Sequence, residues 1–138
     1  MNLVPLAPLV AGLPLLAVGF LGLTERLPRN RFGGVRTPAT LRSDEAFRVG
    51  NKVAGLPTLV AGAVGVLGAV AAWAMPGTGG LLVVALIAFV GLVAITLAGG
   101  VLGNRAADAV PEPAPALPAG CAGCQCGAGG CGTFTKTA

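Results

Sequence analysis

Charged residues are scarce in this chain and are missing altogether from three long segments. They make up 10% of the 138 residues, whereas soluble domains carry about 25%. Residues 3–23, 53–75 and 81–103 contain no charged residue, and each run is close to the ~20 apolar residues that cross a bilayer as a helix. This pattern excludes a soluble globule and predicts an all-α integral membrane protein with three transmembrane helices.

Histidine is absent from the whole sequence, and the apolar runs hold no acidic residue. Nucleophiles activated by histidine, a zinc-protease site in the membrane and a carboxylate proton relay are therefore excluded. No phosphate-binding loop is present either. We expect a protein that is not an enzyme and acts by binding.

The first apolar run is interpreted as a retained helix rather than a secretory signal. Met1 and Asn2 supply no positive charge before it, and it is longer than the apolar core of about 7–15 residues that is typical of a signal peptide. No cleavage site of small residues follows, because Thr24, Glu25 and Arg26 come next.

The basic residues indicate how the protein is oriented in the membrane. Seven of the nine lie between the first and second apolar runs, and the other two follow the third. Cytoplasmic loops carry the excess of Lys and Arg, so we expect an outside N-terminus, an inside C-terminus and a cytoplasmic loop at 24–52. This topology explains the net charge of +4, and nucleic acid is not an expected partner.

Small residues recur at four-residue spacing on the second and third spans. They are Ala61, Gly65 and Ala69 on the second, and Ala94 with Ala98 and Gly99 with Gly103 on the third. Small residues let membrane helices approach closely, and the short connection 76–80 forces these two spans into an antiparallel pair. We expect the faces to pack together within one chain. Helix-mediated oligomerisation is the alternative.

The loop between the first two spans begins with a turn. Gly33 and Gly34 permit backbone angles that other residues avoid, and Pro38 favours an extended Thr37. The segment from residue 30 to 38 is therefore not helical throughout.

An amphipathic helix follows the turn. Ser43 is the predicted N-cap, with Asp44 and Glu45 in the first turn, where the helix dipole favours acids. Three charged residues then follow at four-residue spacing and share one helix face, with the acid first and the two bases after it, an order that favours ion pairs along the helix: Asp44, Arg48 and Lys52. We expect this helix to lie along the inner membrane surface before the second span, with a bend at Gly55 and Pro57.

The same loop carries an extended motif. It consists of Asn30, a turn of Gly, Val, Arg, Thr and Pro at 34–38, a Thr at 40, Ser and two acids at 43–45, Phe47, and Asn51 before Lys-Val-Ala-Gly. This pattern resembles the signature of the SdpI family of bacterial membrane proteins over about residues 28–65. It departs from the family at Phe47, where Trp is usual, and at Val35, where Ile is commoner.

The resemblance implies an immunity protein against a secreted peptide toxin of the SDP type, located in the bacterial plasma membrane. It also implies membrane signalling through a cytoplasmic regulator. The motif supplies the candidate binding and structural residues, which are Asn30, Gly33, Arg36, Thr37, Pro38, Thr40, Asp44, Glu45, Phe47 and Asn51.

Arg36, Thr37 and Asn51 form the expected core of this motif. The planar guanidinium of Arg36 suits a lipid phosphate or an acidic partner, and Asp44 and Glu45 are expected to pair with Arg36 or Arg42. The alternative is that the arginines only set the topology and contact lipid head groups.

The chain after the third span changes composition twice. We divide the whole chain into a three-helix membrane domain at 1–105 with the signature loop at 28–55, an Ala/Pro-rich linker at 106–120, and a disordered Gly/Cys-rich tail at 121–138.

The tail places four thiols close together, at Cys121, Cys124, Cys126 and Cys131. In a reducing cytoplasm these thiols would not form stable disulfides, and they could bind zinc or copper. A thiol- or metal-binding anchor and an accessory subunit of a membrane complex are the alternative functions; no other cofactor is expected.

Overall fold

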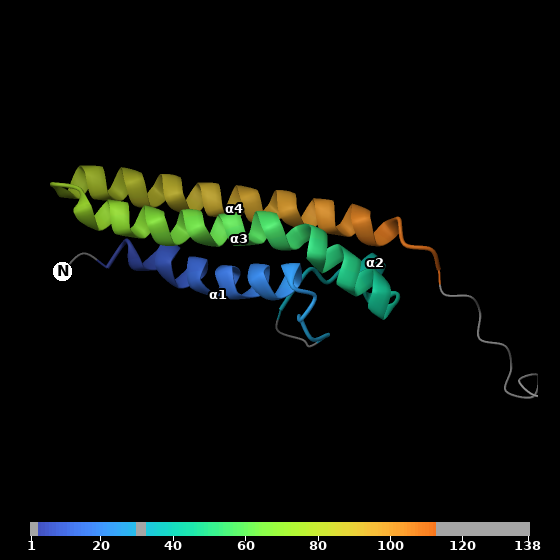
Figure 1. The fold of residues 1–138 in the computed structure, drawn as a ribbon. Coiled ribbons are helices and arrows are strands. Elements are labelled where there is room, and N and C mark those ends of the chain that lie inside the picture. The colour runs from blue at the N-terminus through green and yellow to red at the C-terminus, as the bar shows by residue number, and fades with distance from the viewer. Residues whose placement is uncertain (1–2, 30–32, 113–138) are drawn as a thin grey trace, which may run out of the picture.

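Three long helices and one short helix make up the part of the chain that the computed structural model describes, residues 3–29 and 33–112 (Figure 1). They are α1 (Leu6–Leu23), α2 (Pro38–Leu41), α3 (Asp44–Ala74) and α4 (Thr78–Asp108). α1, α3 and α4 are long and apolar enough to cross a membrane. The predicted all-helical class and the three spans are confirmed.

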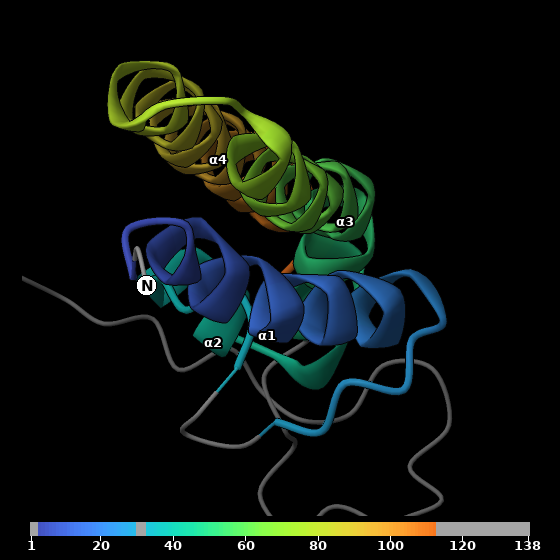
Figure 2. The ribbon, with the colours of Figure 1, turned by 90° about the vertical axis from the view of Figure 1, so that its left-hand side faces the viewer.

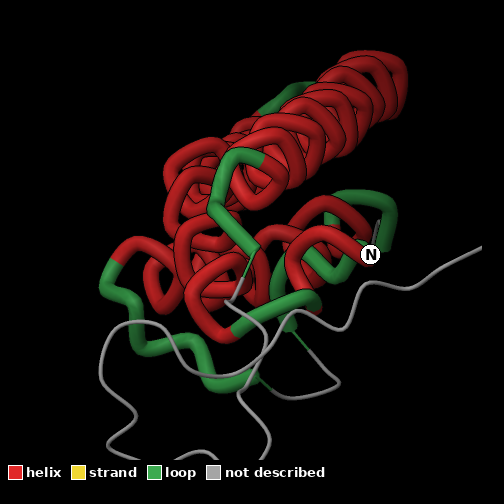
Figure 3. The backbone as a smooth tube through the Cα atoms, turned by 90° about the vertical axis from the view of Figure 1, so that its right-hand side faces the viewer, coloured by secondary structure: helices red, strands yellow, loops and turns green. Residues whose placement is uncertain are grey.

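α3 is the central helix of the bundle. It packs against α1 and against α4 along much of its length, whereas α1 and α4 meet over only a small area. Figure 2, which looks along the bundle, shows α1 crossing below α3 while α4 runs beside it. Figure 3 views the opposite end, where the loop after α1, α2 and the start of α3 lie together. The signature loop therefore lies at the end of a bundle whose outer helices diverge.

Glycines allow α1 to approach α3 closely. A Cβ added at Gly19 would lie 2.5 Å from the backbone N of Leu59, and one at Gly62 would lie 2.6 Å from the backbone N of Leu16. Both distances are too short for any side chain, so these glycines are required by the contact between the two backbones. The sequence pattern did not single out α1 as a glycine-mediated partner of α3.

The small residues predicted on the second and third spans pack within the chain, although not all of them do. A Cβ at Gly103 would lie 2.6 Å from the carbonyl O of Gly50, and one at Gly99 would lie 2.8 Å from Cγ of Pro57. Gly65 lies between α1 and α4, since its Cβ would meet both Pro8 and Leu92. Ala94 and Ala98, in contrast, are exposed on the outer face of α4.

The predicted amphipathic helix and the second span form one continuous helix, α3, so the bend expected at Gly55 and Pro57 does not interrupt it. Pro57 lies inside α3 without ending it. Its ring occupies the space left by Gly99, and the Thr58 hydroxyl donates to the carbonyl of Ala54 at 2.7 Å. Packing against α4 accommodates the ring, and the helix continues through the proline. The placement of its first turns along the membrane surface stays a prediction.

α4 runs past Arg105 to Asp108, so the first residues assigned to the linker are helical. Ala107 and Val110 pack against Ala46 near the start of α3, and this burial extends the helix beyond the apolar run. Most of the linker and all four cysteines of the tail lie outside the described residues.

Candidate functional site

Asn51 joins the loop to α3. Its side chain is almost fully buried, at 4% exposure. Oδ1 accepts a hydrogen bond from the Val35 N–H at 2.6 Å, and Nδ2 donates to the Phe47 carbonyl at 2.8 Å and to the Val35 carbonyl at 3.4 Å. One amide side chain thus pairs with both backbone groups of Val35, as a neighbouring β-strand would. This contact fixes the loop against the helix.

Gly34 is the constrained member of the glycine pair. Its φ is +91°, and a Cβ there would lie 2.4 Å from Oδ1 of Asn51. Among the described residues, a Cβ at Gly33 would meet the Val18 side chain at 3.6 Å and Leu27 at 3.7 Å, which are ordinary contacts. The motif prediction chose Gly33. The sequence alone could not distinguish the two glycines, because the steric constraint on Gly34 comes from Asn51, which is distant in the sequence.

Thr37 and Thr40 close the turn around α2. Thr37 is extended (φ −117°, ψ 164°), as predicted for a residue before proline, and Pro38 is the first helical residue. The Thr37 N–H donates to Oγ1 of Thr40 at 2.8 Å, and the Thr40 N–H donates to Oγ1 of Thr37 at 3.3 Å. Thr40 is fully buried, and its hydroxyl lies 2.9 Å from the Val35 carbonyl. This reciprocal capping satisfies the backbone of a four-residue helix.

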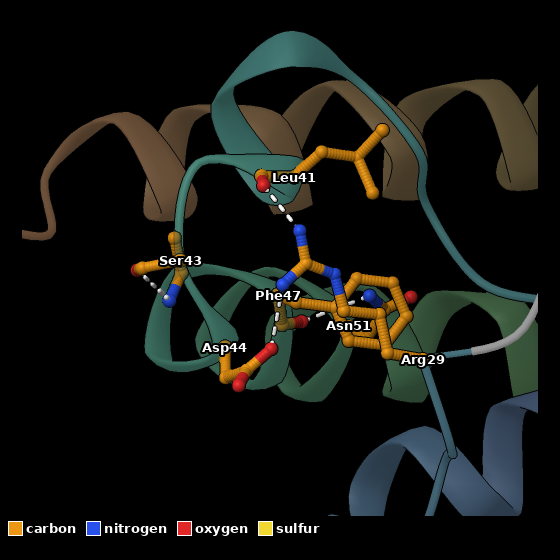
Figure 4. Close-up of polar contacts among 7 residues, drawn as sticks. Arg29, Leu41, Ser43, Asp44, Phe47 and Asn51 are labelled. Carbon is orange, nitrogen blue, oxygen red and sulfur yellow. Dashed lines mark hydrogen bonds and ion pairs between the residues drawn. The ribbon is translucent and has the colours of Figure 1, made fainter.

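The start of α3 is capped and paired as Figure 4 shows. Ser43 accepts from the Ala46 N–H at 3.0 Å, which confirms it as the N-cap. Asp44 pairs with Arg29 at 2.6 Å, and the same guanidinium donates to the Leu41 carbonyl. Arg29 therefore bridges α2 and α3.

The expected charge partners were wrong in two respects. Asp44 pairs with Arg29 rather than with Arg36 or Arg42. Arg48 and Lys52 do not pair with Asp44 along the helix but pair with Glu25, at 3.4 Å and 2.5 Å. The loop after α1 folds back against α3 and presents opposite charges, a long-range contact that helical spacing alone cannot reveal.

Glu25 lies at the centre of this second ion-pair cluster. The hydrogen bond from Lys52 lowers the pKa of the Glu25 carboxyl below its ordinary value, and the charges of Lys52 and Arg48 add to that effect. Glu25 has a positive φ of 57°, which is uncommon for a residue other than glycine. The cluster thus coincides with a sharp turn at the end of α1.

Arg42 caps the C-terminus of α4, a role that the sequence did not reveal. Its Nη2 donates to the carbonyls of Ala107 at 3.0 Å and Val110 at 2.5 Å. Its Nη1 lies 3.9 Å from a carboxylate oxygen of Glu112. The carbonyls at a helix C-terminus have no partner within the helix, and Arg42 satisfies them from the loop.

A cavity of about 460 Å³ lies where the loop meets all three long helices. We name it the central cavity. Its lining comprises Pro14, Leu15 and Val18 of α1, residues 33–36 of the loop, Asn51, Ala54, Gly55 and Thr58 of α3, and Thr96 and Gly100 of α4. Its walls are mainly apolar, with Arg36 and Asn51 supplying polar groups from the loop side. Such a lining suits an amphiphilic ligand.

Two other hollows are lined by five of the remaining motif residues. Asp44, Glu45 and Phe47 line a charged hollow of about 520 Å³ that also includes Glu25 and Arg29. Thr37 and Pro38 line an outer hollow of about 580 Å³ along α4. Asn30 lies outside the described residues. The motif residues therefore belong to one folded loop, but they line three different hollows: the central cavity, the charged hollow and the outer hollow.

Comparison with known proteins identifies the family. The sequence profile of the SdpI/YfhL protein family matches residues 26–99, more than half of the chain. This match begins in the loop after α1 and includes α2, α3 and much of α4. No significant match was found among curated proteins or among solved structures. With its three apolar helices, the chain is a multi-pass membrane protein that belongs to the SdpI/YfhL protein family.

Proposed function

We propose that this chain is a binding protein of the bacterial plasma membrane that confers immunity to a secreted, SDP-type peptide toxin. The observation that carries this proposal is the central cavity of about 460 Å³, which is lined by the signature loop and by all three long helices. Family membership supports the same reading.

The lining of the cavity matches an apolar peptide segment with an acidic or carboxyl group. Leu15, Val18 and Ala54 offer apolar contacts, while Arg36 provides a cation that binds carboxylates in a planar, bidentate manner. None of the described residues that line the cavity is an acid, a histidine or a cysteine. The lining therefore favours binding over acid–base or nucleophilic chemistry.

The way the loop is held supports a role in membrane signalling as well. Arg36 is adjacent to Val35, whose backbone is fixed by Asn51 and Thr40. A ligand that binds Arg36 in the cavity would pull on this fixed backbone and on α2. In the expected orientation this change occurs at the cytoplasmic face, where a regulator would detect it.

The test is survival of a toxin-sensitive bacterium that expresses the protein under challenge with an SDP-type peptide. Wild type should protect, and Arg36→Ala should lose most of the protection. Arg26→Ala is the matched control, since Arg26 is an exposed arginine of the same loop that does not line the cavity. Equal protection by the Arg36 variant would contradict a role for the cavity.

Deletion of residues 119–138 tests the alternative function in the cysteine-rich tail. Protection should persist without these residues if the loop and cavity are responsible. If a deletion variant that still inserts into the membrane loses protection, the function belongs to the tail rather than to the loop and cavity. A measurement of bound zinc and copper in both proteins would then be the next step.

A further inference from the structure

The outer hollow adjoins the central cavity. The two spaces share Val35, Thr96 and Gly100, where the loop crosses α4. The outer hollow measures about 580 Å³, and its α4 wall includes Leu97 and Val101, which are 66% and 53% exposed. Because Leu97 and Val101 belong to the charge-free run of a helix that is long and apolar enough to cross a membrane, we expect this wall to face lipid.

One end of the outer hollow is cationic. Arg105 lines it beside Asn104, near the C-terminal end of α4. The ion pairs within residues 3–29 and 33–112 join Glu25, Asp44 and Glu112 to basic residues of the loop and α3, and none of them includes Arg105. Asp108, one turn further along α4, accepts a hydrogen bond from Asn104 at 3.0 Å. Within the described part of the chain, no acidic side chain thus forms an ion pair with Arg105.

We propose that the outer hollow is a binding site for one anionic phospholipid. Its acyl chain lies against Leu97 and Val101, and its phosphate is held by the guanidinium of Arg105. Basic pockets at the cytoplasmic ends of transmembrane helices select anionic head groups, and arginine binds phosphate through two parallel hydrogen bonds. Complementary charge and an apolar wall in the membrane both favour this occupant.

The site also places the lipid against the signature loop. Thr37 and Pro38 line the hollow together with residues of α4, so the lipid contacts the turn as well as the helix. A bound phospholipid would therefore support the loop in the absence of any peptide. This role goes beyond immunity and does not depend on it.

Gly100 offers a direct steric test. A Cβ at this position would meet no atom of the described residues within 4 Å, so a leucine fits here without disturbing the backbone and reduces the space beside Gly100. Gly79, near the other end of α4, likewise has no atom of the described part of the chain within 4 Å of an added Cβ. Gly79→Leu is therefore a matched control that adds the same side chain to the same helix away from the site.

The experiment is native mass spectrometry of the full chain, extracted in mild detergent and mixed with equal amounts of phosphatidylglycerol and phosphatidylcholine. Wild type should retain phosphatidylglycerol with a preference of about fivefold, the effect of one basic residue at an anionic head group. Arg105→Gln should abolish the preference, and Gly100→Leu should reduce retention of the lipid. Arg26→Gln and Gly79→Leu should both behave as wild type.

Two results would overturn the proposal. One is an unchanged preference for phosphatidylglycerol in Arg105→Gln. The other is unchanged lipid retention in Gly100→Leu, which would show that the lipid binds elsewhere on the protein.

Discussion

Gly34 and Asn51 fit against each other so closely that no side chain can be added between them. A Cβ at position 34 would lie 2.4 Å from Oδ1 of Asn51, and Gly34 has a φ of +91°. The same Oδ1 accepts the Val35 N–H at 2.6 Å. A glycine in the loop and an asparagine on α3 therefore form one structural unit, although they are far apart in sequence.

Gly34→Ala should destabilise the protein by about 1–3 kcal/mol, because it combines a steric clash with a backbone conformation that L-residues avoid. Gly33→Ala is the control and should change stability by about 0.5 kcal/mol or less, since its Cβ would make only ordinary contacts. Thermal unfolding of both variants in detergent measures the difference. Equal losses in the two variants would contradict the assignment of the constraint to Gly34.

Asn51→Ala should release the loop. The substitution leaves the Val35 N–H without the acceptor it has now, at a cost of about 1–3 kcal/mol. Hydrogen exchange of the backbone around Val35 should become faster. Asn104→Ala removes only an exposed hydrogen bond to Asp108, so exchange in the loop should remain at the wild-type rate in that control.

Arg42→Gln should loosen the C-terminus of α4. The guanidinium of Arg42 donates to the carbonyls of Ala107 and Val110, and a shorter neutral side chain does not reach both. We expect faster hydrogen exchange at 107–112 while exchange at the centre of α4 is unchanged. Arg48→Gln, which alters an ion pair elsewhere in the loop, should leave 107–112 unaffected.

Acid should weaken the contact between the loop after α1 and α3. The pKa of Glu25 is lowered in the folded protein by Lys52 and Arg48, so the ion pair stabilises the fold above the ordinary pKa of 4.5. This contribution is lost as the pH falls below that value towards the folded-state pKa, because the unfolded chain then binds the proton more readily.

The melting temperature of wild type and Glu25→Gln, measured from pH 7 to pH 3, tests this prediction. The two proteins should differ at neutral pH and converge in acid. Glu45→Gln is a control at another exposed acid of the same region and should retain the wild-type pH dependence. A constant difference between wild type and Glu25→Gln across the range would exclude the ion pair as its cause.

The parts of the fold set by local sequence were predicted, and the contacts between distant segments were not. Charge-free runs revealed the three spans, Ser43 revealed the start of α3, and Pro38 revealed the extended Thr37. The bridge between Asn51 and Val35 and the capping of α4 by Arg42 join residues distant in sequence. No periodicity or propensity encodes such contacts, which is also why Glu25 was not recognised as the partner of Arg48 and Lys52.

Photocrosslinking tests peptide binding in the central cavity most directly. A photoreactive amino acid at Leu15, which lines the cavity, should form an adduct with an SDP-type peptide in intact cells. The same amino acid at Val83, which is 56% exposed near the start of α4, should form none. Equal adducts from both positions, or none from position 15 in a correctly inserted protein, would contradict binding in the cavity.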